Sequence, residues 1–297
     1  MALPQPLRRG FTSLSLPRSS RLLSTTTTTT TTKITQDAYS NGRIASTQPH
    51  TVDPRWLMII KRRIGRCMMF GLKPHQVREA GEILRQLAWN WRELVAGSEG
   101  YLTDVKRRAS FRHNVVWGEM DAMCFDPNPI FTQYAETARV NFVRNLAMHV
   151  DPAHKSDWMN LVNSTGIGLI LRSIKIDYKF PMKWPDKVTV YQKLVQDPSM
   201  SSDSAFKLDV MILSEARQRP AARCHEDTVM YDYRLAQKMS ALPPFVMEQF
   251  KAMWELQEEA KRVWQQRIVE IEEGVRKLEV ESWDREDAVE DMGSASR

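Results

Sequence analysis

The side chains best placed to do chemistry lie between His113 and Arg139, in HNVVWGEMDAMCFDPNPIFTQYAETAR. Three of the four carboxylates in this segment are candidates, because a carboxylate can activate water or attack a carbonyl directly. Asp121 has either a chemical role or a structural one, in a turn or a cap. Asp126 is a loop acid, solvated or sharing the environment of Asp121. Glu136 is either a second carboxylate facing a pocket or one half of a helix salt bridge with Arg139.

Histidines and cysteines give weaker signals. His113 and His225 are single histidines in or beside predicted strands, where such residues are usually structural. The cysteines, at 67, 124 and 224, have neither metal-site spacing nor a disulfide pattern, so we expect them to be reduced. The chain contains no Gly-rich phosphate loop, G-x-S-x-G, C-x-x-C or H-E-x-x-H. No metal site and no cofactor are therefore predicted.

A long helix follows these acids, from Pro129 to about Met148. Asn128 is a good N-cap residue because its side-chain oxygen accepts hydrogen bonds from free backbone amides, and a proline suits the first turn of a helix. The apolar residues cover more than one stripe, so the helix should be enclosed rather than laid on a surface. They are Ile130, Phe131, Tyr134, Ala135, Ala138, Phe142, Val143 and Ala147.

Segments typical of β-strands surround this helix in the sequence. Two of them alternate apolar and polar residues with period two, as half-exposed strands do. A first strand is predicted over Asn114–Met120 and four more over Gly166–Tyr178, Asp186–Val195, Ala205–Ser214 and Ala222–Arg234. Five antiparallel strands curled around one helix form an α+β hot-dog fold, which is the predicted fold class.

Two motifs carry a family resemblance. WGEMDAM…NPIFTQYAETARV resembles the signature W-G-(E/D)-x-D-x-x-G-H-V-N-N-x-x-Y-x-x-Y-x-E-x-A-R of the 4-hydroxybenzoyl-CoA thioesterase-like hot-dog family, and YKFPMKWPDKVTV resembles its strand-turn-strand Y-x-x-P-x-x-x-P-D-x-V-x-V. The likeness spans about Phe111 to Leu235. It implies the same fold and hydrolysis of an acyl-CoA thioester.

The resemblance also implies roles for individual residues. Asp121 matches the family's base or nucleophile, and Glu136 is expected as a second catalytic carboxylate. The start of the long helix would polarise the thioester carbonyl, since free amides and the helix dipole stabilise a developing oxyanion. The expected substrate-binding residues are Asn128, Ile130, Phe131 and Tyr134.

One segment departs from the family pattern. In place of G-H-V-N-N the chain has Cys124-Phe125-Asp126-Pro127-Asn128, in which only Asn128 matches. Pro127 and Pro129 remove two backbone donors from the region where a carbonyl would be polarised. Either the pocket binds its substrate differently or hydrolysis has been lost.

Residues 1–36 have the composition of a mitochondrial transit peptide, rich in Arg, Ser, Thr and Leu. They hold five of the chain's basic residues and no acid, so they account for most of the net charge of +6. A low-complexity tail is the alternative. Because residues 1–36 carry most of the net charge, the basic pI of the whole chain is no evidence for DNA binding. Residues 37–52 are predicted to be a linker.

Helical extensions are predicted on both sides of the hot-dog domain, which we place at 107–242. The segment 53–106 should form two helices, from Asp53 to Phe70 and from Pro74 to about Ala96. Residues 243–297 should form an amphipathic helix of about 40 residues with an acidic tail. The first extension is basic and the second acidic. The basic segment is either a solvated surface, a site for an anionic partner such as the phosphates of coenzyme A or an RNA surface, or a surface that docks on the chain's own acidic tail. The long helix could fold back on its own chain or bind a mitochondrial protein partner.

These features predict a protein of the mitochondrial matrix that hydrolyses an acyl-CoA. Its partner would be the acyl-CoA substrate, and a homo-oligomer, a dimer or larger, is expected because hot-dog domains commonly pair to complete their sites. No apolar run is long enough for a transmembrane segment. The alternative is a non-catalytic hot-dog subunit of a mitochondrial assembly such as the mitochondrial ribosome. A dehydratase on the same fold ranks last.

Overall fold

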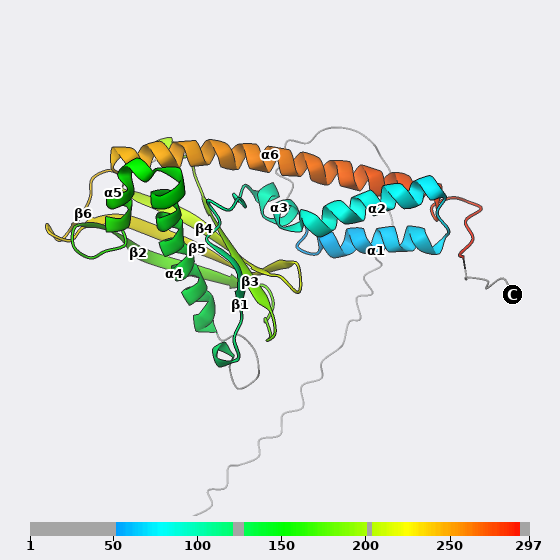
Figure 1. Cartoon of the computed structure of the whole chain (residues 1–297), viewed down its shortest axis with the longest axis horizontal. Coiled ribbons are helices and arrows are strands. Elements are labelled where there is room, and N and C mark those ends of the chain that lie inside the picture. Colours follow the sequence, from blue (N-terminus) through cyan, green and yellow to red (C-terminus); the bar gives the residue numbers. More distant parts are fainter. Residues whose placement is uncertain (1–51, 121–127, 201–203, 292–297) are drawn as a thin grey trace, which may run out of the picture. The chain divides into compact units, whose positions relative to one another are not determined.

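An antiparallel sheet forms the middle of the chain (Figure 1). The computed structural model describes residues 52–120, 128–200 and 204–291. In these residues the strands lie in the order β1-β3-β4-β5-β2, with the short β6 beside β5, so that β2 forms one edge. The bounds are β1 Ser110–Asn114, β2 Ile167–Tyr178, β3 Lys187–Leu194, β4 Ala205–Ser214, β5 Arg219–Asp232 and β6 Gln237–Lys238.

Helix α4 (Asn128–Asn145) lies against one face of the sheet (Figure 1). Its first half packs in one apolar cluster with strands β3, β4 and β5, and burial of these side chains is the main force that holds helix and sheet together. The cluster includes Ile130, Phe131, Ala135, Ala138, Val188, Val190, Val210, Ile212 and Cys224. A sheet wrapped on one helix is the hot-dog fold, so the predicted fold class is confirmed.

The second half of α4 lies under two further helices, α5 (Lys155–Asn160) and α6 (Pro244–Glu281). Phe142 of α4 and Leu146 of the π-helical turn η3 (Leu146–Val150) that continues it share an apolar cluster with Trp158 of α5 and Phe250 of α6. Phe142 and Phe250 stack at a tilted angle with their ring centroids 6.3 Å apart. This end of the helix is therefore enclosed by the chain itself.

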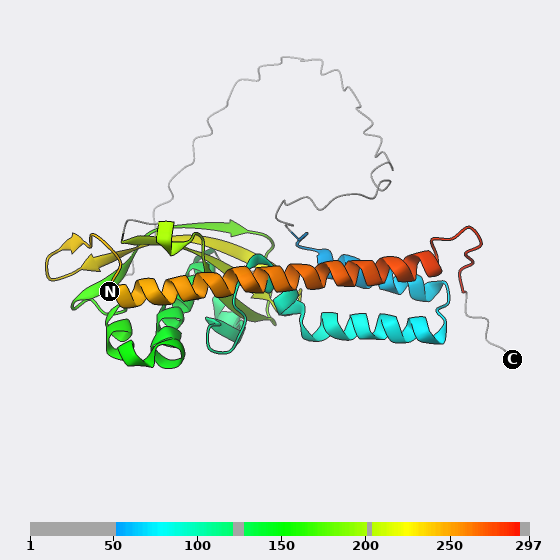
Figure 2. The ribbon, with the colours of Figure 1, turned by 90° about the horizontal axis from the view of Figure 1, so that it is seen from above.

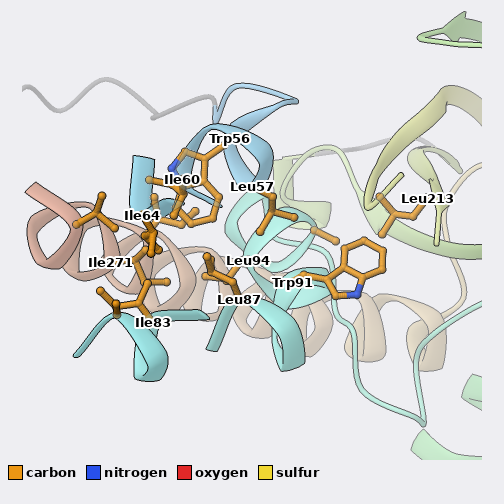
Figure 3. Close-up of a cluster of buried hydrophobic side chains, with 14 of the residues drawn as sticks. Trp56, Leu57, Ile60, Ile64, Ile83, Leu87, Trp91, Leu94, Leu213 and Ile271 are labelled. Atoms are coloured by element: carbon orange, nitrogen blue, oxygen red, sulfur yellow. The ribbon is translucent and has the colours of Figure 1, made fainter. Parts of the chain in front are cut away.

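The N-terminal extension folds on the far half of α6 (Figures 1 and 2). It consists of α1 (Trp56–Met69), α2 (Pro74–Trp89) and α3 (Trp91–Val95). Their apolar faces meet that of α6 in a second core (Figure 3), which includes Ile60, Ile64, Leu87, Leu94, Ile271, Val275 and Leu278. Within the described residues, no helix is long and apolar enough to span a membrane.

Opposite charges add to this packing. The Arg63 guanidinium donates two hydrogen bonds to Glu279 of α6, each 2.8 Å long. Lys277 lies 3.2 Å from Glu79. The basic extension thus docks on the acidic helix of the same chain, as one of the two interpretations of the sequence predicted.

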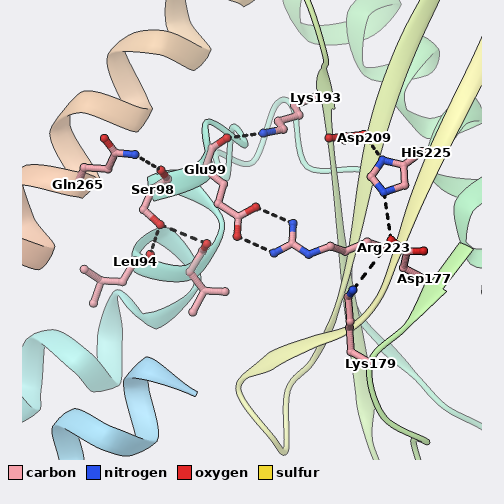
Figure 4. Close-up of polar contacts among 11 residues, drawn as sticks. Leu94, Ser98, Glu99, Asp177, Lys179, Lys193, Asp209, Arg223, His225 and Gln265 are labelled. Carbon is pink, nitrogen blue, oxygen red and sulfur yellow. Dashed lines mark hydrogen bonds and ion pairs between the residues drawn. The ribbon is translucent and has the colours of Figure 1, made fainter. Parts of the chain in front are cut away.

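A short 3-10 turn, η1 (Gly97–Glu99), joins the extension to the sheet (Figure 4). Arg223 of β5 donates two hydrogen bonds of 2.6 Å to the Glu99 carboxylate. Lys193 of β3 donates to the Glu99 carbonyl oxygen at 2.6 Å. His225 of β5 lies between Asp209 of β4 and Asp177 of β2, so its contacts link three strands of the sheet.

Several predicted boundaries are wrong. The first strand is Ser110–Asn114, earlier than the predicted Asn114–Met120, because Trp117–Glu119 closes a 3-10 turn (η2) in which the Glu119 side chain accepts from the Val116 amide. The predicted helix 74–96 is interrupted at Asn90. Strand β5 begins at Arg219, three residues before its predicted start. The other three strands and the long C-terminal helix lie within two residues of their predicted positions.

Candidate functional site

The candidate site lies where β1 leads through η2 into α4. We call this region the tryptophan end of the sheet, after Trp117 of η2 and Trp184 of the β2–β3 connection. Their rings meet edge to face with centroids 5.7 Å apart, and the two residues remain 60% and 51% exposed. The Val115 amide donates to the Asp186 carbonyl oxygen at 3.1 Å and so ties η2 to that connection. Large exposed aromatic rings are typical of binding surfaces.

Glu119 is the polar centre of this end. Its Oε2 accepts from the Tyr134 hydroxyl at 2.9 Å and from the Val116 amide at 3.1 Å. Its Oε1 lies 3.8 Å from Nε2 of His113, whose ring packs edge to face on Tyr134. The carboxylate therefore fixes η2 against α4 and holds the Tyr134 hydroxyl in place.

The residues predicted from the sequence fall into three groups. Asp121 lies outside the described residues. Asn128 begins α4, which places a helix N-terminus directly after that segment. Ile130, Phe131 and Tyr134 are buried in the core of their own chain, with 6%, 2% and 7% of their surface exposed. Their predicted role in substrate binding is untested.

Glu136 is exposed on α4 and lines a pocket of about 360 Å³ between α4 and the edge strand β2. Thr132 and Arg139 of α4 share this pocket with apolar side chains of β2, namely Leu169, Leu171 and Ile174, and with Tyr233. An acid beside an apolar wall at a sheet edge is an arrangement that a second chain could complete.

Arg139 pairs with Glu226 of β5 rather than with Glu136, its predicted partner. The Arg139 guanidinium donates to Glu226 Oε1 at 2.8 Å, and the Glu226 side chain is completely buried. Burial raises the pKa of Glu226, against the opposing effect of Arg139. Its Oε2 has no hydrogen-bond partner within the described residues. A buried carboxylate with one unsatisfied oxygen costs folding free energy and marks a special position.

Two acids of this region, Glu119 and Glu226, were not predicted as candidates. Glu119 could have been found, since it belongs to the W-G-E motif and lies three residues after Val116, the spacing at which a side chain caps a turn. Glu226 has the same parity in β5 as the buried Ala222 and Cys224. An acid at a core position of a strand is unusual enough to be noticed.

The remaining candidate groups do not point to redox or metal chemistry. Burial raises the pKa of the Cys67 thiol, and it raises that of Cys224 to about 12. Both thiols are therefore unreactive in the folded chain. Among the residues that the structure describes, no three His, Cys, Asp or Glu side chains are grouped to hold a metal ion.

Comparison with solved structures gives several thioesterases. A thioesterase from Thermus thermophilus, complexed with coenzyme A and Zn, is 17% identical with a TM-score of 0.38 and covers 52% of this chain and 98% of its own. A gentisyl-coenzyme A thioesterase is 18% identical with a TM-score of 0.38 and covers 47% and 98%. A DHNA-CoA thioesterase from Staphylococcus aureus is 13% identical with a TM-score of 0.35 and covers 53% and 92%. Likeness at this level carries no information about substrate.

Sequence comparison is more informative. No curated protein matches the chain significantly. The model of the thioesterase-like superfamily matches residues 115–250, which include η2, α4 and strands β2 to β6. The hot-dog region of this chain, less than half of its 297 residues, is therefore similar to the thioesterase-like superfamily.

Proposed function

We propose that this chain hydrolyses an acyl-CoA thioester to a free acid and CoA. The observation that carries the proposal is the thioesterase-like match over residues 115–250, which contains both η2 and the start of α4. The finer likeness to the 4-hydroxybenzoyl-CoA thioesterase-like family is supported by the W-G-E-x-D and E-x-A-R motifs. Helix α6 packs on the opposite half of α4, so it does not obstruct the tryptophan end.

The reaction needs a base for water and donors for the oxygen that becomes negative. Asp121, two residues after Glu119, would take a proton from water while the water oxygen bonds to the carbonyl carbon, or would attack that carbon itself. The carbon–sulfur bond then breaks. After attack by water, the CoA thiolate takes up the proton that Asp121 holds. After direct attack, the thiolate takes a proton from solvent, and a water molecule hydrolyses the acyl–Asp121 anhydride to the free acid and restores the carboxylate. The first turn of α4, at Asn128, would stabilise the oxyanion through its remaining free amides, since Pro129 has no amide hydrogen.

Other residues would position the reacting groups. Glu119 binds both Tyr134 and the Val116 amide, so it sets the approach of η2 to the start of α4. Ile130 and Phe131 form the apolar wall behind the first turn. Glu136 would act as the second carboxylate from the pocket beside β2.

A second copy of the chain would complete that pocket. Within the described residues β2 pairs on one side only, and an edge strand of 12 residues is a natural site for pairing with another chain. We therefore propose a homodimer contact at β2. Native mass spectrometry tests it, and a monomer at micromolar concentration would contradict it.

The proposed location is the mitochondrial matrix, on the composition of residues 1–36. A fluorescent protein fused to residues 1–36 should enter mitochondria, and replacement of their four arginines by Gln should prevent import. A mitochondrial protein partner through α6 also remains a prediction. Since α6 buries one face in its own chain, such a partner would bind the face that carries Leu256 and Val263, 42% and 44% exposed.

Release of free CoA thiol from short, long and aromatic acyl-CoAs tests the proposed activity. Asp121→Asn and Asp121→Ala should each lower turnover by about 100-fold or more, the typical contribution of general base catalysis. Asp126→Asn, which removes a neighbouring acid, is the matched control and should retain turnover.

The outcomes separate the parts of the proposal. Turnover that survives both Asp121 substitutions would support the hydrolase activity but show that Asp121 is not the base. A folded protein without turnover on any substrate would reject the hydrolase and favour a non-catalytic subunit of a mitochondrial assembly.

A further inference from the structure

A second pocket, of about 520 Å³, lies between the start of α1 and the β4–β5 hairpin. Its volume falls in the range of small-molecule sites. One wall comes from the first turns of α1, with Arg55, Leu57, Met58 and Lys61, and the other from residues 216–219 of the hairpin. The pocket exists only because the N-terminal extension packs beside the sheet. It uses none of the residues assigned to hydrolysis.

Four cations line this pocket, two from each wall: Arg55, Lys61, Arg217 and Arg219. None of them forms an ion pair within the described residues, whereas Arg63, on the same helix, is paired with Glu279. Asp53 lies at the edge, where its Oδ1 accepts from the Arg55 amide at 2.6 Å. Helix α6 thus pairs with part of the basic extension, whereas these four cations have no ion-pair partner within the described residues.

The pocket is held in shape by contacts between its walls. The Lys61 ammonium donates to Gln218 Oε1 at 2.5 Å across the pocket. Gln218 has a φ of 53°, a left-handed conformation that turns the hairpin and is uncommon for residues other than glycine. Leu57 is buried in the core of the extension. The cations therefore stand on anchored elements.

The pKa values of two of these cations are lowered, as expected for positive charges held close together and partly buried. Burial lowers the pKa of Lys61. Burial and the charges of Arg55 and Arg217 lower the pKa of Arg219. A bound anion would reduce the repulsion between these cations. A guanidinium group can bind two phosphate oxygens at once through parallel hydrogen bonds.

We propose that this pocket binds a small organic molecule that carries two or more phosphate groups. Four positive charges match the charge of such a ligand, and Leu57 with the 57% exposed Met58 offers an apolar contact for its organic part. A concave pocket with charge on facing walls suits a small molecule better than an extended RNA or membrane surface. Two sources share this chemistry, a free nucleotide and the CoA portion of an acyl-CoA.

Calorimetric titration of the full chain with ADP and with CoA, at about 150 mM salt, tests the proposal. We expect saturable binding of at least one ligand. The double substitution Arg217→Gln/Arg219→Gln should weaken it by about 10- to 100-fold, the loss of one charged hydrogen bond or more. Arg62→Gln is the matched control, because it removes an exposed cation of α1 outside the pocket, and it should change the affinity by less than about 2-fold at this screening.

Competition and kinetics identify the source. If acyl-CoA displaces ADP and the double variant raises KM for acyl-CoA at unchanged kcat, the pocket holds the CoA portion of the substrate. If ADP binds and acyl-CoA does not displace it, the ligand is a separate nucleotide. The binding and displacement measurements do not require hydrolysis, so they test the pocket even when no turnover is found.

Three results would overturn the proposal. One is the absence of saturable ADP and CoA binding at millimolar concentration. Another is an equal loss of affinity in Arg62→Gln, which would indicate general charge rather than a site. The third is a short RNA that binds more tightly than both ligands. Thermal unfolding of each variant, with melting temperatures close to that of the parent, excludes misfolding as the cause.

Discussion

The two ends of α4 differ in how far other parts of the chain cover them. At its C-terminal end Phe142, with Leu146 directly after the helix, lies beneath α5 and α6, against Trp158 and Phe250. At its N-terminal end the neighbouring tryptophans, Trp117 and Trp184, are more than half exposed. One helix therefore carries a closed core at one end and an accessible aromatic and polar surface at the other.

This difference teaches where stability and binding reside. Removing apolar surface from water stabilises the fold, while a surface that binds a ligand must keep apolar groups accessible. Helix α6 extends over only one half of the hot-dog domain and so leaves the proposed site accessible. Three substitutions test the contrast.

The largest loss of stability is expected for Phe250→Ala, at the enclosed end. Phe250 is 2% exposed and contacts the rings of Phe142, Trp158 and Phe206, so its removal should lower the free energy of unfolding by about 3–5 kcal/mol. Urea unfolding measures it. Trp184→Ala at the other end is the control, with an expected loss of about 0.5 kcal/mol or less. Equal losses at both ends would disprove the contrast.

A smaller loss is expected for Arg139→Met, in the middle of α4. It leaves the buried Glu226 carboxylate without its cation, which costs about 3 kcal/mol near neutral pH. The double variant Arg139→Met/Glu226→Gln should recover most of that loss, because no buried charge remains. Failure of the double variant to recover would mean that Arg139 acts through packing.

The smallest effect is expected in the pH dependence of stability. The pKa of Glu226 is raised above its ordinary value of 4.5 in the folded chain, so its proton is bound more tightly when folded. The contribution of Glu226 to the free energy of unfolding is present at acid pH and is lost as the pH rises through its pKa in the folded chain. Glu226→Gln should therefore lose less stability than the parent between about pH 4 and about pH 8. Urea midpoints measure it, with the exposed Glu255→Gln as control; identical slopes in all three proteins would contradict it.

Local sequence pattern determined most of the fold. The positions of β2, β3 and β4, and the apolar faces of α4 and α6, follow from residue types and periods that a single segment displays. The predicted half-exposed character of Val188–Val195 is wrong, because Val188–Gln192 are buried on both faces of the sheet and Tyr191 packs in the core of the N-terminal extension. The charge contrast between the extensions also gave their docking as one of two interpretations. The predicted position of the first strand was wrong because the capped turn at Glu119 depends on one side-chain hydrogen bond, which no periodicity in the sequence reveals.

The candidate site was decided mainly by tertiary structure. Sequence motifs identified the segment from Trp117 to Arg139, but only the fold brought Glu119 to Tyr134 and Arg139 to Glu226, 15 and 87 residues apart in the chain. The basic pocket, likewise, unites Lys61 with Gln218, 157 residues apart. Ion pairs and pockets depend on distances across elements, whereas secondary structure depends on neighbours along the chain. That is why the sequence alone determined the helices and strands, and the packing of α6 and the sheet decided which charges meet.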